Sequence, residues 1–114
     1  MSDVLKQPES GQGPMNETLV IDVGKTYQLV SVTLKVSVAP TTSENLTITK
    51  RAAAGAVYDV PLYILDLSIL GATSVVWQPD QPLYLVGGDS VDATWTNTDD
   101  RLWGLEYTVL RIHP

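Results

Sequence analysis

The fold class is indicated most clearly by the stretch Gln28–Val38, which reads QLVSVTLKVSV. Its even-numbered positions are Val30, Val32, Leu34, Val36 and Val38, and the odd positions between them include Ser31, Thr33, Lys35 and Ser37. Such an alternation with a period of two places one set of side chains in a core and the other in water. The stretch therefore predicts a half-buried β-strand. No comparable stretch has the 3.6-residue period of an amphipathic helix.

The rest of the chain has the composition of a β protein. It contains 14 Val, 5 Ile and 12 Thr among 114 residues, and these β-branched side chains favour strands. Turn-forming residues divide it into eight predicted strands, at about residues 18–22, 27–39, 45–51, 57–69, 74–78, 83–86, 90–96 and 102–112. Eight short strands at this spacing predict an all-β, eight-stranded antiparallel sandwich, jelly-roll-like in architecture. Less than a tenth of the chain is expected to be helical.

The predicted strand at 57–69 has an irregular pattern. Its apolar set changes parity part of the way along, which predicts a β-bulge or a bend between sheets. Pro61 cannot donate to a ladder, so the strand is expected at a sheet edge. Residues 50–55 are expected to form a loop or a single turn.

Residues 1–16 contain Pro8, Gly11, Gly13 and Pro14 with few apolar side chains, and they predict a flexible N-terminal arm. Residues 17–114 are then expected to form a single β-sandwich domain. On this interpretation, deleting residues 1–14 would leave the melting temperature nearly unchanged.

Composition argues against most kinds of catalytic site. The chain has no Cys, and its one His is His113, so thiol chemistry and a conventional catalytic triad are not expected. A net charge of −6 disfavours nucleic acid as the partner. No secretory signal or membrane-spanning stretch is expected. The sequence therefore predicts a protein that is not an enzyme, made in a cytoplasm, without a metal, cofactor, nucleic-acid or membrane partner.

The acidic residues are interpreted mainly as turn residues. Asp99 and Asp100 are adjacent in a predicted hairpin loop, which indicates a solvated turn, with a calcium site as the alternative. Asp89 follows two glycines and is expected to cap its own turn, while Asp92 lies just after the start of the next strand.

Aromatic residues are concentrated in the second half of the chain. Strand parity places Trp95 and Trp103 in the core. The residues kept as candidates for a subunit interface or a sugar-stacking surface are Trp77, Tyr84 and Trp103.

Three segments carry a resemblance to a known class of protein. They are YDVPLYILDL at residues 58–67, VVWQPDQPLYL at 75–85 and GGDSV at 87–91. With their aromatic-x-Pro and Gly-Asp-Ser-Val turns, these segments resemble small all-β virion proteins of tailed bacteriophages, over about residues 17–112. The resemblance implies a structural virion component, such as a capsid decoration protein or an accessory head or tail protein, and carries over no catalytic residues.

The expected function is therefore adhesive and the expected location is the virion. The predicted partners are other virion proteins, either the major capsid protein or a head or tail component. The predicted strands expose Thr and Ser with little charge, which favours a homo-oligomer, and a homotrimer is the expected state. The alternative is a carbohydrate-binding module that uses exposed Trp and Tyr side chains.

Overall fold

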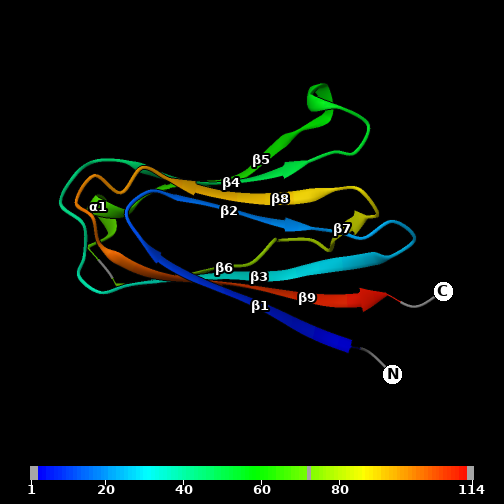
Figure 1. Cartoon of the computed structure of the whole chain (residues 1–114), viewed down its shortest axis with the longest axis horizontal. Helices are drawn as coiled ribbons and strands as arrows, with labels where there is room; N and C mark the ends of the chain where they lie inside the picture. The colour runs from blue at the N-terminus through cyan, green and yellow to red at the C-terminus, as the bar shows by residue number, and fades with distance from the viewer. Residues whose placement is uncertain (1–2, 72, 113–114) are drawn as a thin grey trace.

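The computed structural model describes residues 3–71 and 73–112 and shows a two-layered β-sandwich (Figure 1). The nine strands are β1 (Asp3–Gln12), β2 (Met15–Val20), β3 (Thr26–Val36), β4 (Asn45–Arg51), β5 (Val60–Asp66), β6 (Ser74–Trp77), β7 (Leu83–Val86), β8 (Ser90–Trp95) and β9 (Leu102–Ile112). Within the described residues, the helical segments are two single turns, η1 (Ala56–Tyr58) and α1 (Leu67–Leu70). The predicted all-β antiparallel sandwich is confirmed, with nine strands where eight were predicted.

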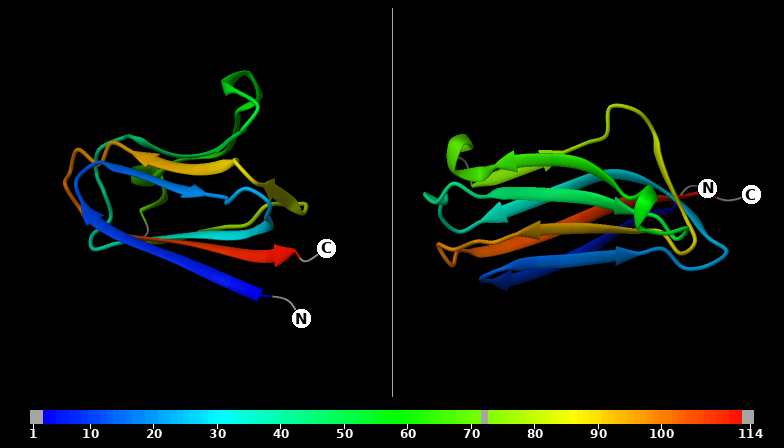
Figure 2. Two further views of the ribbon diagram at one scale, coloured as in Figure 1. Left: turned by 45° about the vertical axis from the view of Figure 1, so that its right-hand side comes forward. Right: turned by 90° about the horizontal axis from the view of Figure 1, so that it is seen from above.

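The strands pair as if one long antiparallel ribbon had been folded over on itself. β1 pairs with β9, β2 with β8, β3 with both β6 and β7, and β4 with β5. Sheet A then has the order β1-β9-β3-β6, with β7 also on β3, and sheet B has the order β2-β8-β4-β5. This nested pairing distributes the strands over two antiparallel sheets that pack as a sandwich. The right-hand view of Figure 2 shows the strands of the two layers running nearly along one axis.

The core lies between the two sheets, and β3 shows how strand parity fills it. Val32, Leu34 and Val36 are buried, as the alternation predicts. A register shift between Leu29 and Ser31 makes Val30 an extra residue in the strand. The core-facing positions before the shift are therefore odd-numbered, as at the buried Leu29. Val38 is 54% exposed because the strand has already ended. The prediction that every even position from 30 to 38 faces the core is therefore wrong at both ends of the stretch.

The predicted strand at 57–69 is shorter than expected. Only Val60–Asp66 is extended, between η1 and α1. The predicted bulge is present, because Ile48 pairs with Tyr63 and Thr49 with Pro61, which leaves Leu62 as the extra residue. Strand β5 is the last strand of sheet B, so the edge position inferred from Pro61 is also confirmed.

Most of the segment that was predicted to be a flexible arm lies in the sheets. Strand β1 pairs with β9 over its ten residues, from Asp3 to Gln12, and β2 already begins at Met15. Met15 is 2% exposed and belongs to the hydrophobic core. The prediction of an arm outside the domain is therefore corrected. The physical reason is that backbone pairing with β9 does not depend on the apolar side chains that this segment lacks.

Candidate functional site

Three loops meet at one end of the sandwich and form the candidate site, called here the loop end. They are the β2–β3 loop (residues 21–25), the β4–β5 loop (52–59) and the β7–β8 turn (87–89), all at the right-hand end of Figure 1. Two backbone hydrogen bonds join the first loop to the third: Gly88 N–H donates to the Ile21 carbonyl at 2.8 Å, and Ile21 N–H donates to the Asp89 carbonyl at 3.0 Å. The loops therefore form one connected surface.

Two glycines allow these loops to approach so closely. A Cβ atom on Gly87 would lie 2.6 Å from the Cα of Val23 and 2.8 Å from the Asp22 carbonyl oxygen. Gly88 has a φ of +91°, which favours glycine, and a Cβ there would lie 2.8 Å from the Cβ of Ala53. The Gly-Gly turn that the sequence predicts is thus the point at which all three loops touch.

Asp89 connects the turn to the β4–β5 loop. Its carboxylate accepts from the backbone N–H of Val86 at 3.1 Å, which confirms the predicted capping of its own turn. It also accepts from the N–H of Ala53 at 3.0 Å, and the Nζ of Lys50 lies 3.9 Å away. The Asp89 side chain is 7% exposed. A buried carboxylate with several donors fixes both loops in one arrangement.

A second set of charged groups fixes the base of the β4–β5 loop. Arg51 donates to the carboxylate of the buried Asp92 and to that of Asp59, the latter at 3.2 Å. Asp59 also accepts from the N–H of Ala52 at 2.9 Å, and Asp92 accepts from the Thr18 hydroxyl at 2.7 Å. The hydrogen bond and charge of Asp92 raise the pKa of Arg51 above its ordinary value. The protruding loop is therefore held in place at its base.

Three large apolar side chains on these loops are exposed. Val23 is 89% exposed, Val57 85% and Tyr58 62%, and these three side chains lie on two of the joined loops. Figure 1 shows the loop that carries η1 standing out above sheet B. Exposed apolar side chains on an ordered surface are typical of a protein contact site. The sequence contains these residues plainly, but the joining of their loops depends on contacts that strand periodicity does not reveal.

The opposite end of the sandwich contains the predicted Asp99–Asp100 turn. The Asp99 carboxylate accepts from the Thr42 hydroxyl at 2.7 Å and from the backbone N–H groups of Thr41 and Thr42, each at 2.8 Å. The Gln12 amide donates to Asp100 at 3.1 Å. Among the described residues, no group of three or more His, Cys, Asp or Glu is arranged to hold a metal ion. Asp99 therefore joins two loops, and His113 lies outside the described residues.

Stability is expected to fall in acid through Asp99. The hydroxyl and N–H groups of Thr42, followed by the N–H of Thr41, lower the pKa of Asp99 from its ordinary 3.8 to about 2. A carboxyl whose pKa is lower in the folded state stabilises the fold above the unfolded pKa, and this stabilisation is lost as pH falls toward 2. Asp99→Asn should therefore lower the melting temperature at pH 7 and reduce its decrease between pH 4 and pH 2. Thermal unfolding across this range tests the expectation, and an unchanged acid slope in the variant would contradict it.

The three candidate aromatic residues do not form one surface. Trp103 is 6% exposed, and its indole N–H donates to the Gly13 carbonyl at 3.0 Å. Trp77 stacks on Tyr63 across the gap between the sheets, with ring centroids 5.6 Å apart, while Tyr84 lies on the outer face of sheet A. The core positions predicted for Trp95 and Trp103 are confirmed. The suggestion that Trp103 stacks on a sugar is corrected, because no face of its ring is open.

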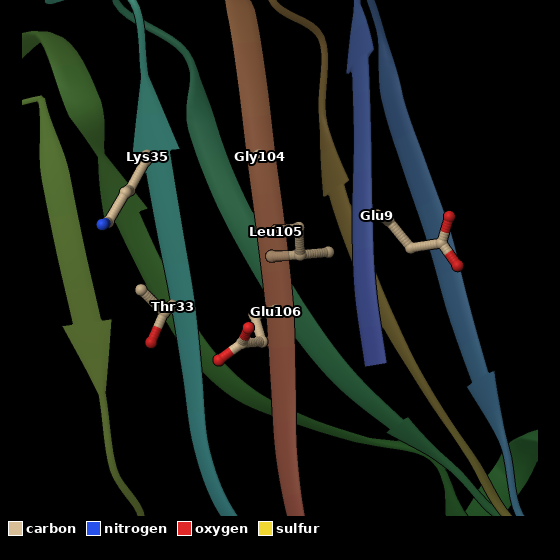
Figure 3. A pocket seen from close by; sticks show the side chains of 6 residues that line it. All are labelled: Glu9, Thr33, Lys35, Gly104, Leu105 and Glu106. Atoms are coloured by element: carbon tan, nitrogen blue, oxygen red, sulfur yellow. The ribbon is translucent and has the colours of Figure 1, made fainter. Parts of the chain in front are cut away.

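A hollow of about 260 Å³ lies on the outer face of sheet A above Gly104, where a side chain is missing. Lys35, Glu106 and Glu9 are among its lining residues. Figure 3 shows the side chains of Lys35 and Glu9 pointing to opposite sides of β9. The charged side chains of Lys35 and Glu9 do not point to a common centre, so this hollow is not taken as a catalytic site.

Comparison with known proteins shows a likeness of fold and nothing more. No protein-family model and no curated protein matches the chain. A chain in the acid-stable capsid structure of Helicobacter pylori bacteriophage KHP30 is similar in structure, with a TM-score of 0.49 and 13% identity, over 95% of this chain and 94% of that chain. A likeness at this level does not establish a shared function. Within the described residues, no helix has the length and apolar character needed to cross a membrane.

Proposed function

We propose that this protein is a non-enzymatic structural component of a bacteriophage virion, a capsid decoration or accessory protein that attaches through its loop end. The observation that carries the proposal is the exposed apolar surface of Val23, Val57 and Tyr58 on loops fixed by buried carboxylates. The motifs at residues 58–67, 75–85 and 87–91, which resemble those of small phage virion proteins, favour a virion partner over other protein partners.

The mechanism of attachment is burial of apolar surface by a preorganised loop. Removing apolar area from water contributes roughly 25 cal/mol per Å². Ordering a flexible loop on binding would offset much of that gain. Here the β4–β5 loop is already held by Asp59, Asp89 and Arg51, so little ordering remains for the binding step. The chain thus binds as a rigid body with its apolar loop end as the anchor.

Assembly with neighbouring gene products tests this function. The chain would be co-expressed with the capsid, portal and tail proteins encoded beside its gene, and the particles isolated by sedimentation. We expect the chain to sediment with particles in a fixed ratio to the major structural protein. A chain that stays in the supernatant with every combination of those proteins would overturn the proposal.

Copies of the chain are expected to associate with each other, most simply as a homotrimer. The outer face of β6 and β7 exposes Val76, Tyr84 and Val86, each by about half. The net charge of −6 makes copies repel, and salt screens that repulsion, so association through apolar side chains should persist or strengthen as salt rises. Light scattering at low and high salt tests this. A monomer under both conditions at tens of micromolar, or an oligomer that dissociates in high salt, would contradict it.

A further inference from the structure

One open side of the sandwich, called here the β5–β7 side, is formed by edge strands of both sheets. Strand β5 ends sheet B there, and β6 and β7 lie at the edge of sheet A. The Tyr63 ring on β5 stacks on the Trp77 ring of β6, with centroids 5.6 Å apart, so the two edges lie together. Apart from Asp66 at the end of β5, these three strands contain no charged residue. Both sheets therefore present an uncharged edge on this side.

Each sheet also has an apolar patch on its outer face beside this edge. Patch A lies on sheet A and consists of Val76, Tyr84 and Val86, which are exposed by 58, 51 and 52%. Patch B lies on sheet B and consists of the exposed Pro61 and of Ile64, which is 56% exposed. Ile64 faces outward because it pairs with Thr47, which alternates with core residues of β4. The two patches therefore lie on opposite outer faces of one sandwich.

A charged side chain lies beside each patch, and the two charges are opposite. Asp66 ends β5, two residues after Ile64 of patch B. Lys35 pairs with Ser74, two residues before Val76 of patch A. Asp66 precedes α1 and Ser74 follows it closely, so both charges lie at the end of the sandwich away from the loop end. The two patches are thus matched in charge as well as in apolar character.

Both charged groups are available to a partner. Hydrogen bonds from Ser43 and Ser68 lower the pKa of Asp66, so its carboxylate is ionised at neutral pH. Lys35 is exposed and forms no ion pair within the described part of the chain. Figure 3 shows its side chain pointing away from β9.

The position of the patches decides which symmetry can cover both of them. In a two-fold contact both copies present the same surface. Because the patches lie on opposite faces, one such contact covers patch A or patch B and leaves the other in water. In a head-to-tail ring, patch B of each copy meets patch A of the next, so one kind of contact covers both. An axis parallel to the strands keeps each residue at its own height, which brings Asp66 of one copy level with Lys35 of the next.

We propose that copies of this chain assemble head-to-tail, with patch B of one copy packed on patch A of the next and Asp66 paired with Lys35 across the contact. The inference rests on the association of copies proposed above, and it identifies the surfaces that form the contact. Apolar burial supplies the affinity, whereas the exposed ion pair mainly fixes the alignment. The β5–β7 side then faces the axis, and the loop ends of all copies lie on one face of the ring.

Two single variants and their mixture test the head-to-tail contact. Ile64→Glu places a carboxylate in patch B and Val76→Glu places one in patch A, and an unpaired carboxylate disfavours burial. Each variant alone should be a monomer in light scattering at tens of micromolar. An equimolar mixture should form a species of two copies, because patch A of the first variant and patch B of the second are intact. The two acidic patches left over repel each other, so the pair should not grow further.

Val20→Glu is the matched control, because Val20 is 64% exposed on β2, at the other edge of sheet B. It should keep the mass of the unmodified chain. Circular dichroism checks that each variant is folded, and Ile64→Gln with Val76→Gln is the uncharged pair to use if a charged variant misfolds. The proposal is overturned if the unmodified chain is a monomer, if either single variant still associates by itself, or if the mixture remains monomeric.

The ion pair is tested separately by Lys35→Glu, which should weaken association more at low salt than at high salt. Association as strong as that of the unmodified chain at low salt would contradict the alignment of Asp66 with Lys35. Ile64→Glu and Val76→Glu leave the loop end intact, so both variants should still sediment with particles. Failure of self-association is therefore distinguishable from failure of the attachment function.

Discussion

A chain that lacks residues 1–14 is expected to unfold at least 10 °C below the full chain, a loss on the order of 2 kcal/mol or more. The reason is that β1 completes sheet A through a ten-residue antiparallel ladder with β9. Gly11 packs directly on the Trp103 ring, since a Cβ atom there would lie 2.8 Å from it. The truncation would expose β9 and the aromatic residue beneath β1.

The β1–β2 turn adds a second cost to the truncation. The Gly13 carbonyl accepts from the Asn97 side-chain amide at 2.8 Å and from the Trp103 indole at 3.0 Å. The truncation removes both hydrogen bonds, and each contributes roughly 0.5–1.5 kcal/mol to stability. Thermal unfolding of the truncated and full chains measures the total loss of stability. Equal melting temperatures would show that residues 1–14 are a dispensable arm.

Trp103→Ala is expected to destabilise the fold by roughly 3–5 kcal/mol, the range for removing a large aromatic side chain from a core. Trp103 is 6% exposed, lies on β9 opposite Gly11, and joins the β1–β2 turn to the sheet through its indole N–H. The substitution removes both the packing and the hydrogen bond. Urea denaturation of the variant and the unmodified chain, analysed with one m-value, gives the difference in their free energies of unfolding.

Tyr84→Ala is the matched control, because Tyr84 is an aromatic residue on the outer face of the same sheet and is 51% exposed. Its removal should change the free energy of unfolding by no more than about 0.5 kcal/mol, as is usual for surface positions. Equal effects of the two substitutions would show that Trp103 does not occupy the core position described here.

The elements that the sequence predicts well are those whose side chains alternate regularly. Val91, Ala93 and Trp95 follow the period of two along β8, and all three are buried as expected. The same reasoning fails at Val30, because a bulge changes strand parity without any Gly or Pro to mark it. It also fails for β1, whose Pro8 and glycines are typical of a linker, although backbone pairing with β9 makes the segment a strand.

The candidate site was only partly accessible to sequence reasoning. The Gly87–Gly88–Asp89 turn was expected from its residue types, and its conformation follows from them. That Val23 and Val57 lie on loops joined by this turn depends on contacts between segments far apart in the chain. No local pattern encodes such contacts, which is why the aromatic residues, rather than the loop valines, were the candidates from sequence.

Co-sedimentation of loop-end variants with particles shows whether the chain attaches through its loop end. Val57→Ser/Tyr58→Ser removes the exposed apolar tip, and neither side chain makes a hydrogen bond or a core contact in the described residues. Ile69→Ser is the matched control, because Ile69 is 82% exposed on α1 at the opposite end. We expect at least a tenfold loss of particle binding for the loop-end variant and unchanged binding for the control. Equal binding by both variants, each folded by circular dichroism, would contradict attachment through the loop end.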